Sequence, residues 1–429
     1  MNFLFVHQNF PGQYVHVVRH LAAAGHGIVA LTQHRNAEIP GVRRLDYAPP
    51  RLKSMAHVYV RDIETAVLNG LAVARVCEGL KREGFVPDIM IGHNGWGETL
   101  YLKDVWPQVP LLAYFEFFYR ASGSDVDFDA EFETRPDDAV RLRTRNAVNL
   151  MGIGAADWGQ TPTHWQHRQY PKRWRDRISV IHEGVDTERA RPDPSARVWL
   201  KSGASFSRDE EVITYVARNL EPYRGFHVFM RALPGILRRC PNAHVLIVGG
   251  DGVSYGRRAQ GYPNWRAKMM AELGDRLDLR RVHFLGRVPY QHYLGILQIS
   301  SAHIYLTYPF VLSWSMVEAM AAGVVMIGSR TPPVEEVIED GENGHLVDFF
   351  DGEMMAERVA EVLRDRQAND RIRAAARDTA LERYDLKGVC LPAYLSLVQD
   401  LVGSRIEGAP PRRRARSRSV PQMSEIAGQ

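Results

Sequence analysis

Short runs of apolar residues alternate along this chain with longer stretches in which apolar positions recur at helical spacing. Such alternation is typical of a parallel β-sheet whose two faces are covered by helices. In the first half of the chain, the predicted strands are Phe3–Val6, Gly27–Leu31, Ile89–Gly92, Leu111–Tyr114, Trp158–Thr161 and Ile178–Ile181. In the second half they are Val212–Val216, Ala243–Val248, Val282–Leu285, His303–Leu306 and Val324–Ile327. Because the pattern occurs twice, we predict an α/β protein with two doubly wound domains.

The periodicity breaks between residues 186 and 209, where Pro192 and Pro194 would stop a helix. We therefore predict a first domain over residues 1–190, a linker over 191–209 and a second domain over 210–385, followed by a helix over 386–402 and a tail over 403–429. In doubly wound sheets, ligands bind at the carboxyl ends of the strands. The predicted site is therefore the cleft across which the two domains face each other.

The composition of the 429 residues is that of an ordinary globular protein, with 45% hydrophobic and 24% charged residues. It excludes a collagen-like, a fully disordered and a multi-span membrane chain. The three cysteines, Cys77, Cys240 and Cys390, lie too far apart for a local C-x-x-C motif or a disulfide framework, which fits a cytoplasmic protein. The start of the chain lacks a basic segment and a long apolar run, so we expect no export through a signal peptide.

The net charge of +4 comes from the last 27 residues, where six arginines oppose Glu407 and Glu425, which leaves residues 1–402 formally neutral. A neutral body argues against a nucleic-acid partner. The tail has no apolar period and is predicted to be disordered. It is either simply solvated or weakly attracted to an anionic membrane surface, at about 1 kcal/mol per basic residue. In the second case, the protein would be peripheral at the inner face of the membrane.

The first turn after a strand, residues 7–14, does not read G-x-G-x-x-G, which argues against a nicotinamide cofactor. Gly12 at the predicted helix start would let a ligand approach the backbone closely, although turn glycines without a ligand are as common. In the second half, Arg218 and Arg224 flank a turn at the end of a strand, before Gly225. Their guanidinium groups match phosphate oxygens, or they form a surface ion pair with Glu221.

A third candidate is the helix predicted to begin near Ser313 and to stop at Gly323. Glu318 lies early in this otherwise apolar helix. It is either placed favourably near the positive end of the helix dipole, or it accepts hydrogen bonds from the hydroxyls of a ligand whose phosphates rest on the helix start.

In the first half, His93 and Glu116 stand at the ends of adjacent predicted strands, facing the cleft. Each is either a structural hydrogen-bonding group or a catalytic one. The aromatic residues around Glu116 belong either to the core or to an acceptor pocket.

The second half resembles the nucleotide-sugar-binding domain of retaining glycosyltransferases of family 4, which have two Rossmann-like domains in the GT-B architecture. The first half is similar to that family in layout, including residues 182–186 before the linker. Four segments of the second half carry the resemblance, in matching order and spacing: residues 218–225, 248–252, 284–288, and 310–323 with 332–338 and 343–347 behind it.

The resemblance implies roles for single residues. Arg224 stands where the family has its phosphate-binding lysine. Asn219 stands where the family has an arginine, so Arg218 either supplies the second cation or points away. Glu318 matches the second glutamate of the E-x7-E motif, which would hold the ribose hydroxyls, whereas Phe310 replaces the first. The backbone around Leu312, Ser313 and Trp314 would receive the diphosphate, Arg287 and Val288 would lie along the nucleobase, and Gly249 and Gly250 would form the neighbouring turn.

The expected activity is transfer of a hexose-type sugar from a UDP-sugar or GDP-mannose to an acceptor hydroxyl with retention, in glycan, polysaccharide or glycolipid synthesis. The catalytic candidates are Arg224, Glu318, His93 and Glu116. No cofactor and no metal are predicted, since the Asp125 and Asp127 pair reads as a solvated turn. The alternative is a catalytically weak scaffold of the same fold that binds a sugar nucleotide or a partner enzyme.

Overall fold

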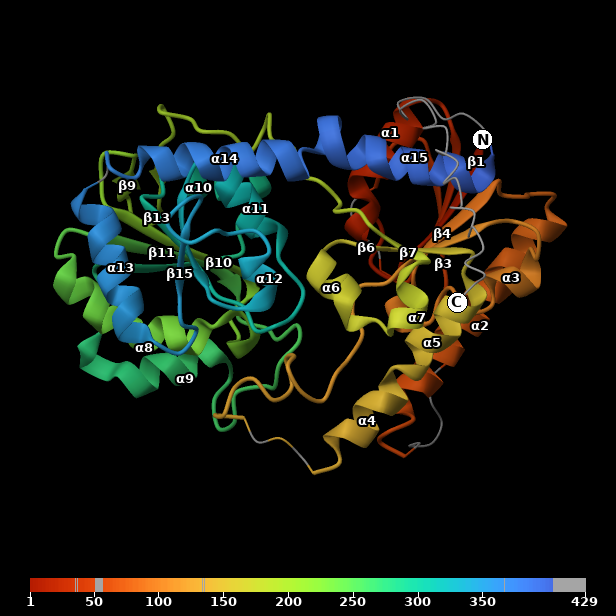
Figure 1. Cartoon of the computed structure of the whole chain (residues 1–429), viewed down its shortest axis with the longest axis horizontal. Helices are drawn as coiled ribbons and strands as arrows, with labels where there is room; N and C mark the ends of the chain where they lie inside the picture. The colour runs from red at the N-terminus through yellow and green to blue at the C-terminus, as the bar shows by residue number, and fades with distance from the viewer. Residues whose placement is uncertain are drawn as a thin grey trace, which may run out of the picture.

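The computed structural model describes residues 1–34, 36, 38–50, 57–132, 134, 136–365 and 367–403. Over these residues, two parallel β-sheets with their helices lie side by side (Figure 1). All eleven strands predicted from the sequence are present, which confirms the two doubly wound domains. The predicted tail lies outside the described residues except for Gly403. No helix among the described residues combines the length and the apolar character needed to cross a membrane.

The N-terminal domain is built on a seven-stranded sheet in the order β3-β2-β1-β4-β5-β6-β7. Its strands are β1 Asn2–Val6, β2 Gly27–Thr32, β3 Val42–Asp46, β4 Ile89–His93, β5 Leu111–Tyr114, β6 Trp158–Thr161 and β7 Ile178–Val180. Its helices are α1 Val15–Ala23, α2 Arg61–Arg82, α3 Leu102–Val105, α4 Asp138–Arg145, α5 Ala147–Ala155, α6 His164–Gln169 and α7 Lys172–Arg175. The sequence reasoning missed β3, because this edge strand is polar and only partly buried.

The C-terminal domain is built on a six-stranded sheet in the order β12-β11-β10-β13-β14-β15. Its strands are β10 Val212–Asn219, β11 His244–Gly250, β12 Val282–Gly286, β13 Ala302–Tyr305, β14 Val325–Ser329 and β15 His345–Val347. Its helices are α8 Phe226–Arg239, α9 Trp265–Leu273, α10 Tyr290–Gln298, α11 Trp314–Ala321, α12 Pro332–Glu335, α13 Gly352–Arg364 and α14 Asp370–Tyr384. The missed strand β15 has only three residues.

The predicted linker contains a small antiparallel hairpin, β8 Val198–Trp199 and β9 Ser205–Phe206. Val198 and Phe206 are buried in one apolar cluster with Val212, Leu246 and Ile296. Part of the linker therefore packs on the C-terminal sheet, while the domain boundaries themselves stay a prediction.

The chain returns to the N-terminal domain through α15 Leu391–Val402, the last helix in the part of the chain that the structure describes. Figure 1 shows α14 along the C-terminal domain and α15 along the N-terminal one. Tyr394, Leu395 and Val398 of α15 are buried in one cluster with Phe3 and Phe5 of β1. The segment that follows the C-terminal domain is therefore anchored by apolar burial in the core of the N-terminal domain.

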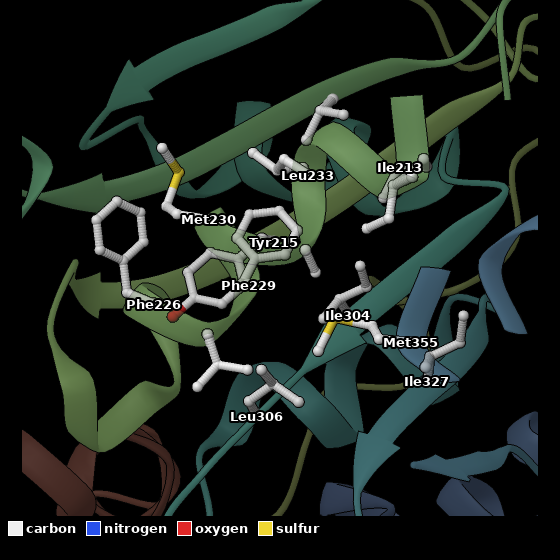
Figure 2. Close-up of a cluster of buried hydrophobic side chains, with 14 of the residues drawn as sticks. Ile213, Tyr215, Phe226, Phe229, Met230, Leu233, Ile304, Leu306, Ile327 and Met355 are labelled. Atoms are coloured by element: carbon white, nitrogen blue, oxygen red, sulfur yellow. The ribbon is translucent and has the colours of Figure 1, made fainter. Parts of the chain in front are cut away.

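The core of the C-terminal domain lies between the sheet and α8 (Figure 2). Tyr215 of β10 stacks on Phe229 of α8, with ring centroids 4.6 Å apart and planes 7° from parallel. Leu233 and Ile304 are fully buried in the same cluster. This packing fixes β10 and β13, whose ends carry the candidate phosphate-binding residues.

In each sheet, the strand order reverses beside the first strand, between β1 and β4 and between β10 and β13. The carboxyl ends of strands at such switch points form the ligand crevice of doubly wound sheets. His7 and His93 stand at the first of these points, and Asn219 and Thr307 stand at the second. Of the predicted site residues, His93 therefore lies at the first switch point, and Arg218, next to Asn219 in β10, lies at the second.

Candidate functional site

Arg224, the candidate phosphate-binding arginine, lies in the turn after β10. Its Nη1 donates to Thr307 Oγ1 and to the carbonyl of Val311, each at 2.8 Å. The side chain is buried at 8% exposure, so the guanidinium is fixed in the crevice and does not extend into bulk solvent. Gly225 has a φ of +66°, and a Cβ there would come within 2.4 Å of the Cβ of Leu306. Glycine therefore lets this turn approach the end of β13.

Glu221 is not a surface partner of the two arginines. It is buried, and its carboxylate accepts the backbone N–H groups of Ser254 at 3.0 Å, Tyr255 at 3.1 Å and Gly256 at 2.9 Å. Because these bonds fix the turn after β11, the interpretation of Arg224 as part of a surface ion pair with Glu221 is wrong.

Helix α11 begins directly after Ser313, as predicted. The Ser313 side chain caps the helix by accepting the N–H of Ser315, and the Ser313 backbone N–H donates to Tyr305 OH at 2.8 Å. The helix stops before Gly323, whose φ is +69°. Leu312 is buried in the core just before the cap. A helix start held in this way presents backbone N–H groups and the positive dipole end to an anion.

Glu318 lies one turn inside α11 and is buried. Its two carboxylate oxygens accept hydrogen bonds from Tyr290 OH at 2.7 Å and Tyr293 OH at 2.6 Å, both from α10. Burial raises the pKa of Glu318 above its ordinary value, although the two tyrosine hydroxyls act in the opposite direction. The sequence reasoning missed these tyrosines, although their i, i+3 spacing, which places both on one face of α10, was an available signal.

Arg287 and Asn219 meet at the edge expected to contact a nucleobase. Arg287 Nη2 donates to Asn219 Oδ1 at 3.1 Å, and Asn219 Nδ2 donates to Ser254 Oγ at 2.7 Å. A Cβ on Gly250 would come within 2.7 Å of both Arg287 Nε and Asn219 Oδ1. Asn219 therefore orients Arg287, and glycine leaves room for that contact. The other two residues predicted here, Gly249 and Val288, directly precede Gly250 and follow Arg287.

Phe310, the residue in place of the first E-x7-E glutamate, lies in an aromatic cluster between the domains. Its ring centroid is 4.6 Å from that of Phe117 in the N-terminal domain, 5.3 Å from Tyr223 and 4.9 Å from Tyr255. Phe310 and Phe117 are both buried. Phe117 thus belongs to the core, and the Phe310 position serves packing between the domains.

In the N-terminal domain, three side chains near the carboxyl ends of β1 and β5 form a hydrogen-bonded row. His7 Nδ1 accepts the N–H of Asn9 at 2.9 Å, so His7 Nε2 carries the proton and donates to Gln13 Oε1 at 2.7 Å. Gln13 Nε2 in turn donates to Glu116 Oε1 at 3.2 Å. Neither His7 nor Gln13 was singled out from the sequence, because they are joined to Glu116 only by the fold.

His93 stands beside this row at the end of β4. Its Nδ1 accepts the N–H of Gly95 at 3.1 Å, so Nε2 bears the proton. This Nε2 lies 3.7 Å from Glu116 Oε2, too far for a hydrogen bond, and it is buried without a partner among the described residues. The ring is stacked between Trp96 and Tyr114, at 4.1 Å and 5.2 Å. The structure therefore brings the two predicted residues together.

The charges of this row are set by burial and by its neighbours. Burial and the nearby His93 lower the pKa of His7 to about 3, so His7 is neutral. Burial alone would raise the pKa of Glu116, but His93 and the charge of Arg218 outweigh it and lower the pKa below its ordinary value. Glu116 is therefore an ionised acceptor at neutral pH. Arg218, exposed at the end of β10, acts on both groups across the cleft.

Gly12 lies at the start of the short 3-10 helix Gly12–Tyr14, with a φ of +49°. A Cβ at this position would come within 2.5 Å of the His7 ring. The glycine is therefore needed for the close approach of His7, and the predicted contact with a ligand stays a prediction.

The prediction of a solvated turn is wrong for Asp125, whereas Asp127 is exposed as expected. Asp125 is buried, and its carboxylate accepts Tyr223 OH at 2.8 Å and Ser124 Oγ at 3.1 Å. The loop carrying it packs on the C-terminal domain, so tertiary contacts bury a residue type that sequence statistics place at the surface. Among the described residues, no group of three or more His, Cys, Asp or Glu side chains is arranged to hold a metal ion.

Comparison with protein families matches both halves of the chain. Residues 24–190 match the glycosyl transferase family 4 group, and residues 200–379 match glycosyl transferases group 1. The chain is 25% identical over 316 residues to a D-inositol 3-phosphate glycosyltransferase of Corynebacterium efficiens, a match that covers 69% of this chain and 68% of that protein.

A second relative is the GDP-mannose-dependent alpha-(1-6)-phosphatidylinositol monomannoside mannosyltransferase of Mycolicibacterium smegmatis. It is 27% identical over 225 residues, which cover 51% of this chain and 56% of that protein, so the chain spans only about half of its length. Among solved structures, the Anabaena protein HepE in complex with UDP-glucose is similar in fold. The two structures superpose with a TM-score of 0.66 and 17% sequence identity. The match covers 93% of this chain and 100% of that chain.

Proposed function

We propose that this chain transfers a hexose-type sugar from a nucleoside diphosphate to an acceptor hydroxyl, with retention at the anomeric carbon. The chain belongs to the glycosyltransferases that combine a family 4 domain with a group 1 domain in the GT-B architecture. The donor is a UDP-sugar or GDP-mannose. The names of the relatives support this, since one is GDP-mannose-dependent and a similar fold binds UDP-glucose. The acceptor belongs to glycan, polysaccharide or glycolipid synthesis.

One observation carries the proposal. The buried Arg224 and the capped start of α11 stand at the switch point of one sheet, and His93 and Glu116 stand at the switch point of the other. The first group suits a diphosphate and the second suits a hydroxyl. The domains that carry the two groups are in contact beside them, since Phe310 packs on Phe117 with ring centroids 4.6 Å apart and Trp314 Nε1 donates to Glu183 Oε2 at 3.0 Å, which supports placing the two groups in one cleft.

The reaction breaks the bond between the anomeric carbon and the diphosphate oxygen, and negative charge develops on the leaving group. Arg224 and the start of α11 would stabilise this charge as preorganised donors, and the exposed Arg218 would add a positive charge beside them. The acceptor oxygen attacks from the same face and forms the new glycosidic bond. Its proton passes to an oxygen of the leaving phosphate, a step taken from the resemblance. Glu116 and His93 would orient the acceptor hydroxyl, and Glu318 would bind the ribose.

The experiment is a thermal-shift screen of the purified chain with UDP, GDP and ADP, followed by donor turnover. A ligand that binds the folded state stabilises it by RT ln(1 + [L]/Kd), about 2.7 kcal/mol at 100 Kd. We expect one of the first two nucleotides to raise the melting temperature and the matching sugar nucleotide to be consumed. No shift with any nucleotide would overturn the proposal.

A second candidate, a catalytically weak scaffold that binds the sugar nucleotide or a partner enzyme, is favoured by Phe310, which is committed to packing in place of a donor-sugar contact. It predicts the same thermal shift without turnover of any common donor. Turnover at one molecule per second or faster, which is ordinary for enzymes, would exclude it.

The arginine-rich tail is a separate proposal, drawn from the sequence alone. Its six arginines between residues 403 and 429 would attract the chain weakly to anionic lipid. Full-length protein is expected to sediment with vesicles containing anionic phospholipid but not with neutral ones. Protein ending at Gly403 would sediment with neither and would retain transfer activity. Equal sedimentation of both proteins would refute the contact.

A further inference from the structure

Glu183, which follows β7, is a buried carboxylate that reaches both domains. Its side chain is 4% exposed. One oxygen, Oε2, accepts the indole Nε1–H of Trp314 at 3.0 Å, and the other, Oε1, accepts Tyr114 OH. Tyr114 ends β5 of the N-terminal domain, and Trp314 begins α11 of the C-terminal domain.

Each partner of Glu183 belongs to one half of the proposed site. Trp314 is the first residue of the helix whose start would receive the diphosphate. The ring of Tyr114 stacks on His93 with centroids 5.2 Å apart and planes 28° from parallel. His93 in turn faces Glu116 at 3.7 Å. A continuous row of contacts thus leads from the phosphate-binding helix to the acceptor-side cluster.

A purely local role would not require this arrangement. An ionised carboxylate only accepts hydrogen bonds, whereas an indole N–H only donates. Because the two donors come from different domains, the carboxylate links the orientation of Trp314 to that of the buried Tyr114. A shift of one domain relative to the other would break one of these two hydrogen bonds, and a buried carboxylate that loses a partner is unfavourable.

We propose that Glu183 is an interdomain positioning residue: it aligns the start of α11 with the His93–Glu116 cluster, so that donor and acceptor meet in register. This inference rests on the proposed function and adds to it a residue to which neither the E-x7-E motif nor the strand-end reasoning gave a role. Glu183 touches no reacting atom. It acts through Trp314 and Tyr114.

The test is a double-mutant cycle with Glu183→Gln, Trp314→Phe and the combined variant. A hydrogen bond to a charged group corresponds to roughly a tenfold or greater change, so each single variant should lower kcat about tenfold while the Kd for UDP or GDP stays within about threefold. The kcat of the combined variant should be no lower than that of the more impaired single variant. The matched controls Glu357→Gln and Trp199→Phe, both at exposed positions, should leave kcat unchanged. An additive loss in the combined variant would overturn the proposal.

Hydrogen–deuterium exchange supplies a readout that needs no turnover. Glu183→Gln should increase exchange both at residues 313–316 and at residues 93–96, which lie in different domains, whereas Glu357→Gln should increase neither. Increased exchange on one side alone, or on neither, would overturn the proposal even in a folded variant. Coupled exchange in a chain without donor turnover would instead refute the proposed function and leave the positioning role intact.

Discussion

The two walls of the cleft are built in different ways. On the C-terminal wall, Arg224 and Ser313 come from two strand-to-helix turns and Glu318 from within α11, and their partners are neutral hydroxyls and backbone groups. On the N-terminal wall, His7, Gln13, His93 and Glu116 come from the ends of three strands and from the helical turn after β1, and they hold one another. The first wall suits binding of a fixed anion, and the second suits a reacting hydroxyl. Substitutions on the two walls should therefore affect different steps.

The largest effect should follow Glu116→Gln. The variant keeps the size of the side chain and an acceptor for Gln13 but loses the negative charge opposite His93. Because Glu116 would orient the acceptor hydroxyl and a misplacement of about 1 Å can cost about 100-fold in rate, kcat should fall by about 100-fold while the Kd for UDP or GDP changes by less than about threefold. Initial rates and calorimetric titration measure the two quantities. A raised Kd with unchanged kcat would place Glu116 on the donor side and reverse the comparison.

Arg224→Met should produce the opposite pattern on the other wall. Charge-assisted hydrogen bonds contribute about 1.5–3 kcal/mol, so the Kd for the nucleotide should rise about 10- to 150-fold. Because Arg224 is buried, Arg224→Lys serves as the folded comparison and should recover part of the affinity. The exposed Arg43→Met is the control. Unchanged affinity in the Met variant would show that the diphosphate lies elsewhere.

Glu318→Ala should have a smaller and more specific effect. If the carboxylate holds the ribose, the variant loses about tenfold in affinity for the ribonucleotide. The variant then binds the ribonucleotide and the 2′-deoxynucleotide with equal affinity. Titration of wild type and variant with both forms measures this discrimination. Tyr290→Phe should preserve it, because Tyr293 still orients the carboxylate, and Tyr262→Phe is the surface control. Equal discrimination in wild type and Glu318→Ala would leave Glu318 as a structural residue only.

The same contrast explains how far sequence reasoning reached. The strands and the C-terminal wall were predictable because each motif is local: a buried strand, a glycine or serine at a turn and an arginine or glutamate lie within about ten residues. Arg224, Ser313 and the start of α11 were found in this way, although their roles stay predictions. Edge strand β3 and the short β15 were missed because they carry little apolar pattern.

The N-terminal wall was only half predictable because its row is assembled across the fold. Gln13 and Glu116 are 103 residues apart in the chain, and nothing near either of them signals their contact. The Asp125 prediction failed for a related reason: burial of this carboxylate depends on Tyr223, 98 residues away. The sequence shows that Phe310 departs from the motif, but it does not predict that Phe310 packs against Phe117.

The smallest effect should come from a buried support behind the N-terminal wall. Glu98 is fully buried and accepts Tyr47 OH at 2.8 Å, and burial raises its pKa from 4.5 to about 7. Between these pH values, the folded chain keeps a proton that the unfolded chain has lost, so the contribution of Glu98 to stability falls as pH rises from 4.5 to 7. Glu98→Gln removes this titration, worth at most about 3 kcal/mol at 1.36 kcal/mol per pKa unit.

The melting temperature of Glu98→Gln relative to wild type should therefore increase between pH 5 and pH 8, by a few degrees at most in a chain of this size. Glu357→Gln should show no such trend. The C-terminal wall provides the contrast, since no comparable pH dependence is expected from Arg224→Lys, where both residues stay charged over this range. If the melting temperatures of wild type and Glu98→Gln change with pH in parallel, Glu98 is already ionised at pH 5. The N-terminal wall would then be supported, like the C-terminal one, without a buried proton.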